Sequence, residues 1–84
     1  MTTNQVSITE SKFTETALYV SAICGKTSAI VVINDWEVRV IIQNAMHKAY
    51  KGHGKAFRTV AEAIANYKKD DVKAIIQAAD ELNR

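Results

Sequence analysis

The chain has 84 residues, of which 48% are hydrophobic and 24% charged, and its formal net charge is +2. This length leaves room for a single core, and the composition is ordinary for a globular domain, which argues against a disordered chain and against a polycation. The longest wholly apolar run, residues 29–33, is far too short to span a bilayer. We expect residues 1–84 to form one domain without a membrane segment, with flexibility expected only over the polar residues 1–5.

The first half of the chain is rich in β-branched residues and predicts strands. Residues 5–9 read as a short strand, and residues 16–24 alternate between two sides until Gly25 ends the run. Residues 28–33 form a third apolar run, followed by an Asn-Asp pair that suits a tight hairpin. The predicted inward side of the second strand consists of Leu18, Val20, Ala22 and Cys24.

Residues 37–43 allow two readings. In a strand, Val38, Val40 and Ile42 would alternate on the inward side, but the apolar residues around residues 36–46 also fit helical spacing, with Asp35 as a cap. The β-branched density favours the strand. Two aromatic residues, Trp36 and Tyr67, are expected to lie in the core.

The second half predicts two helices. Thr59 and Glu62 form a capping box, with the helix running to about Tyr67. Asp70 is the next candidate cap, and an amphipathic stripe follows it, formed by Val72, Ile75, Ile76, Ala79 and Leu82. The predicted fold is therefore α+β, with a small antiparallel sheet of three to four strands followed by two helices packed on one face.

Three patterns could carry chemistry, and each is weak. Gly25-Lys26-Thr27 matches the tail of a phosphate-binding loop, but no glycine stands five residues before Gly25 and β-branched residues follow, so a hairpin turn is the simpler reading. The spacing of His47 and His53 does not suit a metal pair, and Cys24 is the single cysteine. We expect no catalytic residue, no metal site and no cofactor.

The basic stretch, residues 47–58 with the sequence HKAYKGHGKAFR, is predicted to be a loop before the helix and is the main candidate for function. It contains both histidines and no acidic residue. Cations interleaved with aromatic rings suit single-stranded nucleic acid or an acidic protein surface, although a solvated loop before the helix would look the same. We expect its Lys and Arg side chains to face solvent and the Tyr50 ring to be partly exposed. The candidate binding residues are Arg39, His47, Lys48, Tyr50, Lys51, His53, Lys55 and Arg58.

Three pieces of sequence, QNAMHKAYKGHGKAF, EAIANYK and VKAIIQAAD, are similar to small, mostly uncharacterised accessory proteins of proteobacterial prophages and integrative elements. The resemblance covers residues 43–79 only. In these relatives the aromatic residue is often Trp where this chain has Tyr50. The resemblance implies a mobile-element setting, in which proteins of this size often inhibit a host defence complex, as anti-CRISPR proteins do.

We therefore expect a non-enzymatic binding protein that inhibits or assists a host macromolecular complex through the basic stretch. The partner would present an acidic or nucleic-acid-contacting surface. Direct binding of single-stranded DNA or RNA is the alternative, and a small enzyme that uses a histidine or Cys24 is a more remote one. The single cysteine and the absence of a signal-peptide pattern lead us to expect a cytoplasmic protein, and a homodimer remains open.

Overall fold

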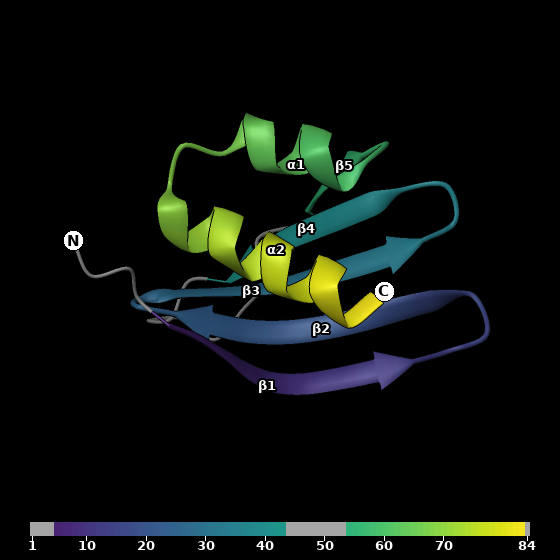
Figure 1. The fold of residues 1–84 in the computed structure, drawn as a ribbon, viewed down its shortest axis with the longest axis horizontal. Helices are drawn as coiled ribbons and strands as arrows, with labels where there is room; N and C mark the ends of the chain where they lie inside the picture. Colours follow the sequence, from purple (N-terminus) through teal and green to yellow (C-terminus); the bar gives the residue numbers. More distant parts are fainter. Residues whose placement is uncertain (1–4, 44–53, 84) are drawn as a thin grey trace.

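The computed structural model describes residues 5–43 and 54–83, which form an antiparallel sheet with two helices on one of its faces (Figure 1). The expected α+β class is confirmed, with five strands where three to four were predicted. In chain order, which is also their order in the sheet, the elements are β1 (Val6–Phe13), β2 (Ala17–Cys24), β3 (Thr27–Asn34), β4 (Val38–Gln43), β5 (Lys55–Phe57), α1 (Val60–Asn66) and α2 (Asp70–Asn83).

Two strands depart from the prediction. β1 continues to Phe13, although its second half is polar, because an outer strand that buries neither face needs no apolar alternation. β5 arises within the basic stretch, where a loop was predicted, and it has only three residues. A strand this short depends on its pairing with β4, which no local sequence pattern predicts.

The three central strands follow the predicted alternation. Residues 38–43 form a strand, which settles the choice between strand and helix there. Gly25, with a φ of 61°, lies in the turn between β2 and β3. The turn after β3 is closed by Asn34, whose side-chain oxygen accepts hydrogen bonds from the backbone N–H groups of Trp36 (3.1 Å) and Glu37 (2.7 Å). This arrangement is an Asx turn, as the Asn-Asp pair indicated.

The capping box is confirmed at its first residue. The Thr59 hydroxyl accepts a hydrogen bond from the backbone N–H of Glu62 at 3.1 Å, and α1 begins at the next residue after Thr59. α2 begins at Asp70, which lies in the first turn of the helix rather than before it. The carbonyl of Lys69 accepts the first helical hydrogen bond, from Lys73.

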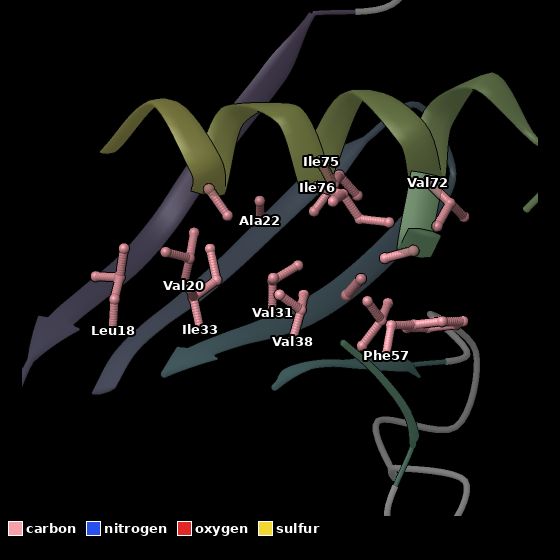
Figure 2. Packing of buried hydrophobic residues seen from close by; sticks show 14 of the residues in the cluster. Leu18, Val20, Ala22, Val31, Ile33, Val38, Phe57, Val72, Ile75 and Ile76 are labelled. Atoms are coloured by element: carbon pink, nitrogen blue, oxygen red, sulfur yellow. The ribbon is translucent and has the colours of Figure 1, made fainter. Parts of the chain in front are cut away.

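The core lies between the sheet and the helices. Figure 2 shows Val72, Ile75 and Ile76 of α2 pointing toward side chains of β2 and β3, and both isoleucines are fully buried. α2 crosses β2 and β3, whereas α1 covers the side of β4 and β5 (Figure 1). The buried strand residues are Leu18, Val20, Ala22, Cys24, Ala29, Val31, Ile33, Val38, Val40 and Phe57.

Three residues expected inside the protein are exposed. Trp36 is 67% exposed, because it lies in the turn between β3 and β4 rather than on a strand facing the helices. Leu82 and Ile42, each at the end of its element, are both 38% exposed. The other expected aromatic, Tyr67, is half-buried and packs against the core.

Candidate binding surface

The basic stretch enters the described part of the chain at Gly54, which is fixed against β4. Its φ is 76°, in the left-handed region that side chains disfavour. A Cβ atom at this position would lie 2.5 Å from the carbonyl oxygen of Val40 and 2.6 Å from Cγ1 of Ile41. Both the conformation and the close approach require glycine, so the start of β5 has a defined position on the sheet.

Lys55 is exposed but held in place by the first helix. It lies opposite Val40 in the pairing of β4 with β5, so it shares the helix-covered side of the sheet. Its Nζ atom donates a hydrogen bond to Oδ1 of Asn66 at 3.1 Å. The same Nζ atom lies 5.7 Å from the centroid of the Phe57 ring, within the range of a cation–π interaction. The charge of Lys55 is therefore presented from a restricted position.

Arg58 follows β5 and is exposed, directly before the helix cap Thr59. The expectation that Lys55 and Arg58 face solvent is confirmed. Both belong to the short segment between Gly54 and Thr59, which is braced by the sheet on one side and by α1 on the other. This segment offers two cations on a constrained backbone.

The aromatic residue of this segment belongs to the core. Phe57 is only 6% exposed, and its ring meets that of Tyr67 edge-to-face, with centroids 5.8 Å apart. Phe57 cannot serve as a stacking platform for a base without leaving the core. Its apolar contacts attach β5 to the rest of the molecule.

Arg39 lies on the other face of the sheet. It is opposite Ala56 on β5 and opposite Val32 on β3, away from the helices. Its guanidinium group pairs with the carboxylate of Glu37 at 3.3 Å. Because alternate residues of a strand face opposite sides, the pairing register places Arg39 and Lys55 on different faces. The described residues therefore do not bring these two cations together.

The remaining candidate binding residues lie outside the described residues. They are His47, Lys48, Tyr50, Lys51 and His53.

Cys24 points into the core, as the alternation of β2 predicted. Its thiol donates a hydrogen bond to Oδ1 of Asp71, with the sulfur 3.5 Å from the oxygen. Burial, the hydrogen bond to Asp71 and the charge of that carboxylate all raise the pKa of the thiol. A thiol with a raised pKa stays protonated and is a poor nucleophile, so the geometry does not support Cys24 as a catalytic residue.

The other weak motifs acquire no site. Gly25-Lys26-Thr27 forms a hairpin turn that leads into β3 rather than into a helix, so it lacks the helix N-terminus of a phosphate-binding loop. Over residues 5–43 and 54–83, no group of three or more His, Cys, Asp or Glu side chains could hold a metal ion. Neither helix in this part of the chain is long and apolar enough to cross a membrane.

A hollow of about 180 Å³ lies at the end of the sheet where β1 turns into β2 and β3 turns toward β4. Leu18 and Ile33 contribute apolar surface, while its charged lining residues are Glu15 and Asp35. This acidic character separates the hollow from the basic segment.

The sequence analysis missed the helix-free face of the sheet as a surface. Tyr19 and Ile23 of β2 are 44% and 42% exposed there. Lys12, Tyr19, Val32 and Arg39 form one cross-strand row on this face. The signal was present, because the non-core positions of β2 and β3 carry apolar residues where an ordinary solvated face would be polar.

Comparisons with known proteins found no match among family models, curated proteins or solved structures.

Proposed function

We propose that this protein is a non-enzymatic binding protein of a mobile genetic element, which inhibits or assists a host macromolecular complex through its basic stretch. The observation that carries this proposal is the braced position of Lys55, whose ammonium group is held by Asn66 and lies over Phe57. A charge held in place before binding loses less conformational entropy on binding. The mobile-element setting and the cytoplasmic location are supported by sequence alone.

An acidic protein surface is the partner that these residues suit best. Complementary charges speed association and select the partner, and restricted cations define a pattern that the partner must match. The burial of Phe57 removes one of the two rings of the basic stretch that could have stacked on a base. Stacking contributes much of the sequence-independent binding of single strands, so its loss favours a protein partner.

A matched pair of charge reversals tests the proposal. K55E/R58E reverses two cations of the braced segment, and K68E/K69E makes the same change in net charge at two exposed lysines between α1 and α2. The tagged proteins would be expressed in a host cell, and bound complexes would be recovered with and without nuclease. We expect the wild type and K68E/K69E to recover the same host complex, and K55E/R58E to lose it. Nuclease treatment should not release the complex from the wild type.

The melting temperature of each variant serves as the folding control. Exposed charges contribute little to stability, so both double variants should melt within a few degrees of the wild type. If K55E/R58E and K68E/K69E retain the same complex equally well, the basic segment is not the binding surface.

A second candidate function, direct binding of single-stranded nucleic acid, is favoured by the cross-strand row on the helix-free face. There the exposed Tyr19 ring has Lys12 on one neighbouring strand and Arg39 two strands away on the other side. Cations beside an exposed ring can hold phosphates while a base stacks on the ring. In titrations with a short oligonucleotide, Tyr19→Ala should weaken binding by about 1–3 kcal/mol, whereas Tyr19→Phe should not. Equal affinities of Tyr19→Ala and the wild type would exclude this candidate.

A further inference from the structure

β1 is an outer strand with an open edge. Its eight residues pair with β2 on one side, and within the described part of the chain no element pairs with its other side. Every residue of β1 except Val6 is exposed. Such an edge presents unpaired backbone N–H and C=O groups and is a template for another strand.

The hairpin that follows β1 shows which backbone groups point outward. The N–H of Thr14 donates to the carbonyl oxygen of the first β2 residue at 2.8 Å, which closes the hairpin. In an antiparallel ladder, hydrogen-bonded and non-hydrogen-bonded pairs alternate. Counting back along the register, Lys12 and Glu10 direct their backbone groups toward β2. Ser11 and Phe13 direct theirs toward the open edge.

We propose that β1 pairs antiparallel with β1 of a second copy of this chain, about a two-fold axis at Ser11. The two five-stranded sheets then form one continuous sheet. The two Ser11 residues face each other as a hydrogen-bonded pair. Glu10 of each copy lies opposite Lys12 of the other.

Charge complementarity selects this register over its neighbours. The side chains of Glu10 and Lys12 share the helix-free face, because they lie opposite Ser21 and Tyr19 in the pairing with β2. A shift of the register by two residues in one direction places Glu10 opposite Glu10 of the second copy. A shift in the other direction places Lys12 opposite Lys12 of the second copy. Opposite charges on facing strands stabilise pairing, and like charges oppose it.

Two apolar residues of β1 gain cover in the same register. Ile8 and Phe13 are 41% and 64% exposed, and both lie on the helix-covered side of the sheet. Phe13 comes opposite Thr9 of the second copy, next to its Ile8. The register shift between Ile8 and Glu10 marks a bulge, so regular pairing between the two copies extends no further than Thr9. The dimer is therefore weak and concentration-dependent.

This dimer goes beyond the proposed function and does not depend on it. If both hold, one assembly carries two basic segments. Two linked weak contacts then act together, which raises the overall affinity for a complex with repeated subunits.

Sedimentation equilibrium at low salt tests the register through single charge reversals. E10K and K12E should each dimerise about tenfold more weakly than the wild type, because both symmetric pairs become repulsive. An equimolar mixture of E10K and K12E should recover the wild-type association, since every reversed position then faces its opposite charge. E15K makes the same charge change in the adjacent turn. It should dimerise as strongly as the wild type, unlike E10K.

Ser11→Pro tests the backbone. The ring removes an N–H group that faces solvent in the monomer, so the fold should survive while dimerisation is lost. A melting curve of each variant confirms folding. The proposal is overturned if the wild type is monomeric at about 1 mM. Pairing of β1 with a strand of another protein would not rescue it. It is also overturned if the mixture associates no better than the separate variants.

Discussion

The two outer strands of the sheet are held in different ways. β5 has three residues, and its Phe57 side chain is buried against Tyr67, while its Lys55 is tied to α1. β1 has eight residues, seven of them exposed, and contacts mainly β2. Figure 1 shows α1 beside β5, whereas β1 runs along the margin of the sheet.

A small domain can thus keep two kinds of contact apart, one at each edge of its sheet. At β5 the side chains fix the strand, so the charges that remain exposed have restricted positions and suit a foreign surface. At β1 the backbone edge itself remains open, so it suits another strand. Substitutions at the two outer strands should therefore have unequal effects on folding and association.

The two phenylalanines of the outer strands provide a matched comparison. Phe57→Ala should lower the free energy of unfolding by about 3–5 kcal/mol, because a buried ring is lost and a cavity remains. Phe13→Ala should change it by less than about 0.5 kcal/mol, since that ring is 64% exposed. Urea unfolding at low protein concentration, where no second copy lies against the outer edge of β1, measures both. Equal losses would show that the outer strands are held alike.

The glycine before β5 should tolerate substitution less well than the glycine between β2 and β3. Both have positive φ, so alanine should cost about 1–2 kcal/mol at either position. At Gly54 the new Cβ would also meet the Val40 carbonyl oxygen at 2.5 Å. Gly54→Ala should therefore be more destabilising in urea unfolding than Gly25→Ala. A smaller loss at Gly54 would mean that β5 does not approach β4 as described.

The brace on β5 should weaken when α1 loses its cap. Thr59→Ala removes the acceptor for the Glu62 N–H and should cost about 1 kcal/mol. Thr59→Ser keeps the hydroxyl group and should cost less. Thermal unfolding distinguishes the two, and identical melting temperatures for both variants would argue against a capping role.

On the β1 side of the core, Cys24 should make stability depend on pH. The pKa of its thiol is raised in the folded protein above the usual value of 9.0. As the pH rises past about 9, the thiol therefore loses its proton in the unfolded chain before it does so in the folded protein. The folded state then binds more protons than the unfolded state, and the free energy of unfolding falls as pH rises past about 9. Cys24→Ala should flatten this decline, measured by urea unfolding. Tyr67, whose pKa burial also raises, adds a decline of the same sign near pH 10 in both proteins. Parallel pH profiles would contradict the buried-thiol assignment.

Local patterns predicted the part of the fold that buries apolar surface. The alternation of β2 and the apolar stripe of α2 could be predicted because each places apolar residues on a face that packs against the other element. The part of β1 beyond residue 9 could not be predicted, because an exposed outer strand requires no alternation of apolar and polar residues. β5 was missed because its three residues become a strand only through long-range pairing with β4.

The candidate site was predictable in composition but not in arrangement. The exposure of Lys55 and Arg58 followed from charge, since unpaired cations are costly to bury. The separation of Arg39 from Lys55 followed from the β4–β5 register, which the sequence does not reveal. Phe57 resembled Tyr50 in spacing among cations, yet its place opposite Val38 puts it in the core.

Amide hydrogen exchange at a low and a high protein concentration tests the contrast between the two edges most directly. Exchange at Ser11 and Phe13 should slow as the concentration rises, because a second copy covers the outward N–H groups. Exchange at Lys12, whose N–H faces β2, and along β5 (Lys55–Phe57) should not change with concentration. Concentration-independent exchange at Ser11 and Phe13, or equal slowing along β5, would contradict the distinction between an open edge and a braced one.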